Sequence, residues 1–185
     1  MPGPVVTAGE RVVLRTVERE DAAVLQRSKT DPRIRFSLGS VFPSSRAQLE
    51  SGMEEWLESD STVAYIACVD DDPSAGHPDE DETTVIGSVS ARHVDGDRPW
   101  LAYWLLPEFH GEGYGKEMVR LAVDDIFSSH PVHGISAGAY GFNEASRGLL
   151  ESLGFTQEAR QRQCRYIDGA YRDEIQYGLL RREWE

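Results

Sequence analysis

The strongest constraint on the fold is a nearly continuous apolar run that passes through a glycine-rich turn into an amphipathic helix. The run covers residues 100–106, and Pro107 ends it. Continuous hydrophobicity of this kind is typical of a central strand that is buried on both faces. From Gly113 to about residue 130, apolar residues recur at steps of three and four, which predicts a long amphipathic helix. The unit is therefore a strand, a turn and a helix.

The turn itself reads His110-Gly111-Glu112-Gly113-Tyr114-Gly115-Lys116. Glycines let the backbone turn tightly and approach a ligand without a side-chain clash. The unpaired N–H groups of the helix start and the positive end of the helix dipole face that same ligand. The turn therefore predicts an anion cradle that fits a pyrophosphate, with Lys116 adding a cation. The alternative is a glycine-rich loop that binds nothing.

Two common nucleotide sites are not supported by this turn. A P-loop needs a Ser or Thr after its Gly-Lys pair, and here Glu117 follows Lys116. A dinucleotide fingerprint needs GxGxxG and an acidic residue downstream for the ribose, and both are missing. Nucleotide hydrolysis and hydride transfer therefore lose support.

Short periodic blocks account for the rest of the chain. Apolar and β-branched runs predict further strands at 11–15, 63–69, 83–92, 133–139, 156–166 and 171–180. Helical spacing predicts helices at 18–28, from Ser44 or Ser45 to about 58, and from Asn143 to 154. No repeat divides the chain, so we expect one domain over residues 1–185. Its fold class is α/β, with a mixed central sheet and helices on both faces.

An acidic segment separates two of the predicted strands. Residues 70–82 contain seven acids, two prolines and no Lys or Arg. This composition predicts a solvated hairpin loop without a catalytic role. A calcium site is not favoured, because the segment lacks the ligand order and the central glycine of an EF-hand.

Charge and hydropathy exclude several classes of partner. The formal net charge is −13, from 32 acids against 19 bases, and a nucleic-acid backbone would be repelled by such a surface. The acidity is equally typical of a halophilic cytoplasm and of an ordinary acidic protein. No apolar run approaches the ~20 residues that span a bilayer, and the N-terminus lacks a secretory signal pattern. We therefore expect a cytoplasmic protein without nucleic-acid or membrane partners.

The two cysteines, Cys68 and Cys164, lie far apart, with no CxxC motif or Cys/His cluster around them. A zinc site and a disulfide framework are not expected, and no metal ligands are assigned. Buried, inert cysteines are the commoner kind, so both are expected to be packing residues.

The chain resembles the GNAT acetyltransferases, in particular the branch of the ribosomal-protein N-terminal acetyltransferases. The resemblance covers almost the whole chain, and four ordered blocks carry it: Arg11-Val12-Val13-Leu14-Arg15; Tyr103-Trp104-Leu105-Leu106-Pro107-Glu108-Phe109 continuing into the glycine turn; Asn143-Glu144-Ala145-Ser146 leading to Leu153-Gly154-Phe155; and Leu179-Leu180-Arg181-Arg182-Glu183-Trp184. It implies a mixed, mostly antiparallel sheet of about seven strands.

The resemblance also implies acetyl-CoA as co-substrate, no metal, and a role for each block. The backbone of Tyr103, Trp104 and Leu105 would hold the pantetheine arm and the thioester, and the amides from His110 to Gly115 would take the pyrophosphate. Asn143 would contact the cofactor arm, which is compatible with a role as a helix cap. Ser146 would protonate the departing thiolate; the alternative is a capping or solvent-exposed serine.

Departures from the family pattern leave the general base open. The tyrosine that commonly acts as the acid is replaced by Leu150, and Gly138 and Trp100 stand where some relatives have a glutamate. Other candidates for the base are Asp173, Glu174 and His93, each of which also suits a structural role. Tyr166 and Tyr171 are candidates for the acceptor pocket or for cross-strand packing.

The implied reaction is direct acetyl transfer from acetyl-CoA to an amine, without an acyl-enzyme. The acceptor is a protein N-terminal amine or a small amine such as a polyamine, amino acid or aminoglycoside. A non-catalytic CoA-binding or regulatory module is the alternative, favoured by the missing tyrosine and glutamates. The sequence is compatible with a homodimer but does not fix the oligomeric state.

Overall fold

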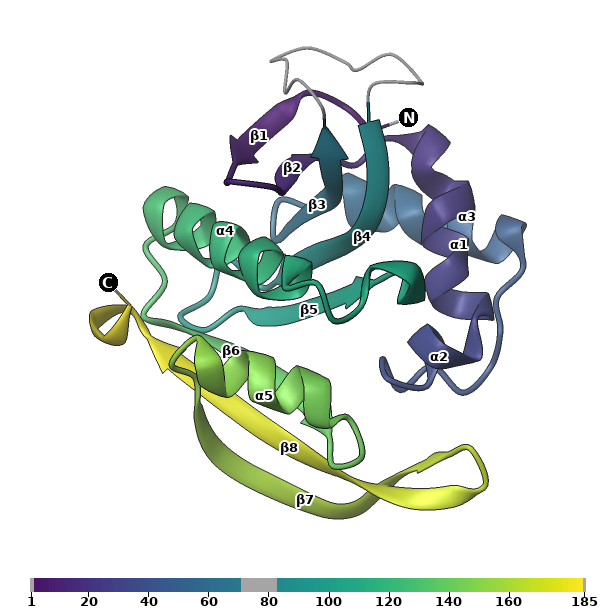
Figure 1. Ribbon diagram of the computed structural model, residues 1–185, viewed down its shortest axis with the longest axis vertical. Coiled ribbons are helices and arrows are strands. Elements are labelled where there is room, and N and C mark those ends of the chain that lie inside the picture. Colours follow the sequence, from purple (N-terminus) through teal and green to yellow (C-terminus); the bar gives the residue numbers. More distant parts are fainter. Residues whose placement is uncertain (1, 71–82, 185) are drawn as a thin grey trace.

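Figure 1 shows the computed structural model, which describes residues 2–70 and 83–184. Apart from Asp70, the predicted acidic loop at 70–82 lies outside these residues. Eight strands form one sheet in the order β1-β2-β3-β4-β5-β6-β8-β7. They are β1 (Val5–Ala8), β2 (Val13–Thr16), β3 (Thr62–Asp70), β4 (Thr83–Arg92), β5 (Trp100–Leu105), β6 (Gly134–Tyr140), β7 (Thr156–Ile167) and β8 (Ala170–Leu180).

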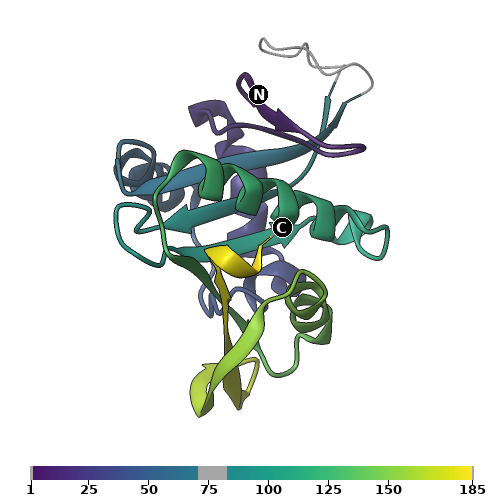
Figure 2. The ribbon, with the colours of Figure 1, turned by 90° about the vertical axis from the view of Figure 1, so that its left-hand side faces the viewer.

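The helices surround this sheet. They are α1 (Ala22–Thr30), α2 (Pro32–Arg35), α3 (Arg46–Leu57), α4 (Tyr114–Ser129) and α5 (Glu144–Ser152), with short 3-10 turns at η1 (Arg19–Asp21), η2 (Pro107–Phe109) and η3 (Arg181–Glu183). Helices α4 and α5 lie on one face of the sheet, and α1 and α3 lie on the other (Figures 1 and 2). The predicted α/β class with helices on both faces is confirmed.

The strand pairing is mostly antiparallel, as expected. Among the described strands, β5 and β6 form the parallel pair. The sheet has one strand more than the predicted seven or so, because β1 joins β2 at the edge. Strand β1 and helix α2 have four residues each, too few to show a periodic pattern.

Two apolar clusters hold these layers together. The larger one packs the apolar side of α4, including Met118, Ala122 and Ile126, against the sheet. The smaller one lies on the opposite face, where Leu25 of α1 and Met53 of α3 contact strand β3. Because helices cover both faces, the middle parts of β3 and β4 are buried on both sides. In β5 only Leu101 is buried, so the expected burial of this strand on both faces is wrong; its residues line a cavity instead.

One cysteine is buried in the core and the other is exposed. Cys68 is fully buried in the smaller cluster, and burial raises the pKa of its thiol to about 12, so it is the packing residue that was expected. Cys164 is exposed, and the same expectation is wrong for it. The reason is its strand: β7 is an edge strand whose residues are mostly exposed.

A buried ion pair fixes the end of the sheet near the N-terminus. The Arg15 guanidinium on β2 donates to the Asp70 carboxylate at the end of β3 through Nε at 3.1 Å and Nη2 at 2.8 Å. Both side chains are 1% exposed. Arg15 also donates to the Gly3 carbonyl oxygen at 3.1 Å. The pair therefore joins two strands and the N-terminal segment.

Removing one member of this pair should be costly. We expect Arg15→Met to lower the free energy of unfolding by about 3–5 kcal/mol, because the Asp70 charge is left buried without its partner. Urea titration measures the change. As a control, Arg46→Met breaks a pair with Glu50 in which both side chains are 52% exposed, and it should cost no more than about 1 kcal/mol. Equal effects of the two variants would contradict the assignment.

Candidate active site

Strands β5 and β6 pair over only two residues and then separate. The registered pairs are Trp100 with Ser136 and Leu101 with Ala137. Beyond Leu101, strand β5 keeps β4 on one side and has no registered partner on the side toward β6. Its backbone groups on that side are left for a ligand or for water.

The alternation of the β5 backbone shows which groups face this open side. The Trp104 carbonyl oxygen points at Gly87 of β4, and the Leu106 N–H donates to the Ile86 carbonyl at 2.8 Å. Neighbouring residues point their N–H and C=O to opposite edges. The polar backbone groups of Tyr103 and Leu105 therefore face the open side. Trp104 contributes its side chain instead, because its backbone is turned toward β4.

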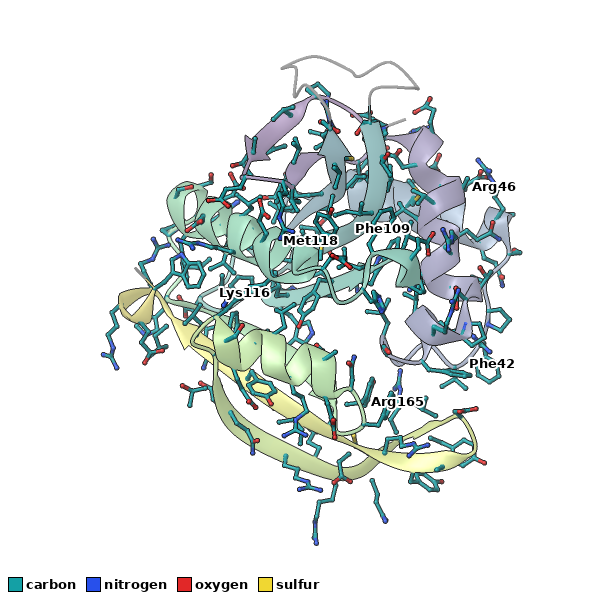
Figure 3. The ribbon with its side chains drawn as sticks, viewed as in Figure 1. Phe42, Arg46, Phe109, Lys116, Met118 and Arg165 are labelled. Atoms are coloured by element: carbon teal, nitrogen blue, oxygen red, sulfur yellow. The ribbon has the colours of Figure 1, made fainter. Side chains whose placement is uncertain are left out.

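A cavity of about 510 Å³ lies along this open edge. Ten of the twelve residues proposed from the sequence line it: Tyr103, Trp104, Leu105, His110, Gly111, Gly113, Gly115, Lys116, Asn143 and Ser146. Glu112 and Tyr114 do not. Lys116 lies on the side of α4 that faces α5 (Figure 3). The His110 ring, through Nε2, lies 3.1 Å from the Leu105 carbonyl oxygen and so fixes the turn against the strand.

Glycine is needed at each of the three turn positions for a structural reason. Gly111 and Gly113 have φ values of 85° and 87°, in the left-handed region that other residues rarely adopt. Gly113 is the N-cap of α4, so the positive end of the helix dipole lies at the cavity. A Cβ on Gly115 would lie 3.1 Å from a methyl carbon of Leu149 and 3.3 Å from one of Leu105. The third glycine thus lets α4 approach α5 and β5.

The two turn residues that do not line the cavity are held by a group that the sequence reasoning did not identify. The Arg11 guanidinium donates to the Glu112 carbonyl oxygen at 2.9 Å and lies 4.8 Å from the centre of the Tyr114 ring. Glu117 Oε1 accepts from the backbone N–H groups of Arg11 at 2.7 Å and Val12 at 3.1 Å. The turn is therefore braced by the loop before β2.

The side chain of Tyr103 meets Ser146 across the cavity wall. Their hydroxyl oxygens are 2.7 Å apart, and the Tyr103 hydroxyl also lies 3.3 Å from the Ser146 carbonyl oxygen. Burial raises the pKa of Tyr103 to about 12, so the phenol stays protonated at neutral pH. Sequence reasoning assigned Tyr103 only a backbone role. The strand alternation, which puts residues 101, 103 and 105 on one face, was the available signal.

Asn143 serves as the N-cap of α5. Its Oδ1 accepts from the Ser146 N–H at 3.1 Å, which fixes the first turn of the helix. The same contact holds Ser146 in place opposite Tyr103. The capping role that was considered for Asn143 is therefore present, and it is compatible with a contact to the cofactor.

The candidates for the general base occupy different places. Glu174 lines the cavity and makes no hydrogen bond or ion pair with the described residues; a Cβ on Gly138 would lie 3.0 Å from its Oε1 and 2.8 Å from the Trp100 ring. Asp173 points elsewhere, because its carboxylate accepts from the Gln163 N–H and from Arg160, each at 2.8 Å, and both contacts lower its pKa. His93 is exposed and lines neither described cavity. Only Glu174 of the three faces the site.

The two candidate tyrosines for the acceptor pocket lie outside it. Tyr166 and Tyr171 are paired across β7 and β8, with ring centres 5.2 Å apart and exposures of 53% and 65%. They form the cross-strand pair that was the alternative reading. Tyr140, which the sequence did not single out, does line the cavity and stacks on Phe142 at 5.8 Å.

A family model described as an acetyltransferase (GNAT) domain matches residues 11–156. The chain belongs to this family. The SPbeta prophage-derived uncharacterized N-acetyltransferase YokL of Bacillus subtilis is 28% identical over 180 residues, covering 96% of this chain and 94% of that protein. YdaF of the same organism, which is provisionally named a ribosomal N-acetyltransferase, is 30% identical over 104 residues, or 55% of this chain and 57% of YdaF. The expected family, and with it the enzyme class of N-acetyltransferases, is confirmed.

Solved structures agree on the fold. The spermidine N-acetyltransferase of Vibrio cholerae, solved with CoA and spermine, aligns with a TM-score of 0.82 at 19% identity, covering 95% of this chain and 98% of that one. A structure described as a probable acetyltransferase gives a TM-score of 0.78 at 22% identity, with 97% and 98% covered. At such identities the likeness establishes the GNAT fold and leaves the acceptor open.

The described residues show neither a membrane-spanning helix nor a cluster of metal ligands. None of the helices there has the length and apolar character needed to cross a membrane. No group of at least three His, Cys, Asp or Glu side chains within residues 2–70 and 83–184 is arranged to hold a metal ion.

Loss of the α5 cap should be visible in stability. We expect Asn143→Ala to lower the free energy of unfolding by about 1 kcal/mol, because the Ser146 N–H loses its acceptor. Asn143→Asp keeps an acceptor oxygen at the same place and should retain most of the stability. Chemical unfolding of the three proteins measures the difference. Equal losses in both variants would show that the cap is not what Asn143 contributes.

Proposed function

We propose that the protein acetylates a primary amine with acetyl-CoA as donor, and that the two substrates meet at the open edge of β5. The observation that carries this proposal is one cavity lined by the open strand edge, the glycine turn at the start of α4, and Ser146 of α5. A strand edge can pair with the amides of a pantetheine arm, a helix N-terminus can bind a pyrophosphate, and a hydroxyl group can protonate a thiolate. An acyl-CoA thioester is the ligand that uses all three.

The donor would lie along the chain elements that the sequence pattern indicated. The turn from Gly111 to Gly115 offers free N–H groups and a helix N-terminus to the pyrophosphate, with Lys116 as a nearby cation. The open N–H and C=O of Tyr103 and the N–H of Leu105 can pair with the amides of the pantetheine arm. Donors held in advance at the place of the thioester oxygen would stabilise the oxyanion that forms.

The acceptor would approach from the other face of the strand. Trp100, Ala102 and Trp104 point toward the side of α1 and α3, opposite to Leu101, Tyr103 and Leu105. Both sets line the cavity, because β5 has no neighbour at this edge. An amine on one face can therefore reach a thioester on the other.

The proposed chemistry is one direct transfer with two proton movements. The amine nitrogen bonds to the thioester carbonyl carbon, and the carbon–sulfur bond then breaks. Glu174, the unpaired carboxylate in the cavity, takes the proton that the amine loses. Ser146 gives a proton to the departing thiolate, and the Tyr103 hydroxyl at 2.7 Å can replace it. These groups argue against the non-catalytic alternative.

The acceptor is either a protein N-terminal amine or a small amine, and different relatives favour each. The partial match to YdaF favours a protein N-terminal amine, and the fold likeness to spermidine N-acetyltransferase favours a small amine. Release of free thiol from acetyl-CoA, measured with a panel of peptides, polyamines, amino acids and aminoglycosides, distinguishes these classes. Cofactor binding without thiol release on any amine would instead support the CoA-binding module.

Gly113 tests the donor site. We expect Gly113→Val to abolish binding of acetyl-CoA, because valine is strained at φ 87° and its side chain would stand in the turn. A ligand at 100 times its dissociation constant stabilises a protein by about 2.7 kcal/mol, so wild-type protein should show a clear rise in melting temperature. Gly169→Val is the matched control, since Gly169 has a φ of 76° in the β7–β8 turn, away from the cavity. It should keep the cofactor shift.

Ser146 tests the chemistry. We expect Ser146→Ala to bind acetyl-CoA normally but to lower kcat, by up to the ~100-fold that marks the low end of general-acid effects. Pre-steady-state thiol release shows whether chemistry limits the rate. Ser152→Ala removes another hydroxyl of the same helix, one that donates to the Leu149 carbonyl at 2.8 Å, and should keep kcat. Wild-type turnover by Ser146→Ala, with chemistry limiting, would assign the proton to water or to another group.

A further inference from the structure

A second cavity, of about 470 Å³, adjoins the first one on the face of α1 and α3. The two cavities share Leu38, Trp100, Ala102 and Trp104, so they meet at β5. Trp100, Ala102 and Trp104 belong to the strand face from which we propose that the acceptor approaches. The second cavity therefore lies where the body of an acceptor would extend from the reacting amine.

This second cavity carries two unpaired cations. Lys29 is half-buried in the last turn of α1, and Arg92, which is exposed, ends β4 at the same cavity. Within the described part of the chain, neither side chain makes a hydrogen bond or an ion pair, and no Asp or Glu lines the cavity. Burial lowers the pKa of Lys29, and the charge of Arg92 lowers it further. In a chain with a net charge of −13, two positive charges stand together here without a carboxylate, and a bound anion would remove their mutual repulsion.

The rest of the lining is apolar or hydroxylic. Trp56, Trp100 and Trp104 face the cavity, together with Leu25, Leu49 and Met53. On β4, Ser88 and Ser90 lie on the same face as Arg92, because alternate residues of a strand share a face. The cavity thus offers apolar walls to the body of a ligand, and two positive charges and hydroxyl groups to an anionic oxygen.

We propose that the acceptor is a small amine that bears an anionic oxygen group, a carboxylate or a phosphate, bound by Lys29 and Arg92. This inference rests on the proposed acetyl transfer and names the class of its acceptor. The reacting amine lies at the open edge of β5, and the anionic group lies in the second cavity. A polyamine fits poorly, because its second ammonium group would meet two positive charges.

Direct binding tests this independently of catalysis. Three of the four tryptophans line the cavity, so intrinsic fluorescence reports on its occupancy. The probes are ω-aminohexanoate, ω-aminohexyl phosphate, hexylamine and diaminohexane, which share one chain and differ in the terminal group. We expect the two anionic probes to bind at least about tenfold more tightly than the other two, since a hydrogen bond to a charged group is worth that much. The tighter of the two identifies carboxylate or phosphate.

Variants assign the effect to the cations. Lys29→Met should raise the Kd of the anionic probes about tenfold or more and leave that of hexylamine unchanged, and Lys29→Arg should restore most of the affinity. Arg120→Met, which removes a charge with 63% exposure on α4, is the control and should change neither. Anionic probes that bind no better than hexylamine, or a Lys29→Met variant that weakens all probes alike, would overturn the inference.

Turnover separates this inference from the proposed function. Thiol release with the anionic probes, reduced in Lys29→Met through a higher KM rather than a lower kcat, supports both. Acetylation of hexylamine or diaminohexane in preference to the anionic probes refutes the anionic acceptor while leaving acetyl transfer intact. Failure of every amine, together with no stabilisation by acetyl-CoA, refutes acetyl transfer, and the fluorescence titration then still decides whether the cavity is an anion site.

Discussion

The site depends on how little of β6 pairs with β5. A parallel pair that ends after two registered residues leaves one edge of a central strand without a neighbour. Buried backbone groups need partners, so such an edge is stable only if a ligand or water supplies them. Helix α4 follows this strand after η2 and the glycine turn, and α5 follows β6 after a short turn, so both helix starts lie beyond the ends of the separating strands. The early end of the β5–β6 pairing thus accounts for the cavity, for the unpaired backbone groups of β5 along it, and for the helix N-terminus of α4 beside it.

The same departure makes both faces of β5 accessible from one place. Side chains alternate along a strand, so a closed sheet would separate the α4 side from the α1 side completely. At the open edge, Tyr103 and Trp104 are neighbours in sequence, face opposite layers, and still line one cavity. This is the geometry that a direct transfer between two bound substrates requires, because the reacting atoms must meet without passing through the protein.

The sequence was sufficient for features that depend on local pattern. Hydrophobic periodicity located seven strands and the longer helices, the glycine turn located the start of α4, and the Ser45 and Asn143 caps are where the pattern put them. What it missed depends on contacts between distant residues. The hydrogen bond between Tyr103 and Ser146 spans 43 positions. The choice between the adjacent acids Asp173 and Glu174 depends on which of them Arg160 pairs with across the hairpin. Neither contact can be recognised from the hydrophobic periodicity of the sequence.

The charge of the chain illustrates the difference between long-range and local electrostatics. A net charge of −13 favours cationic acceptors in solution. At physiological salt that attraction fades over about 8 Å, so it acts on the encounter rather than on the bound state. Inside the cavity, the groups within contact distance decide which ligand stays, and there the unpaired charges are Lys29 and Arg92. A net negative chain and a cationic cavity are therefore compatible, and the composition of the whole chain is a poor guide to the charge of a ligand that this cavity would bind.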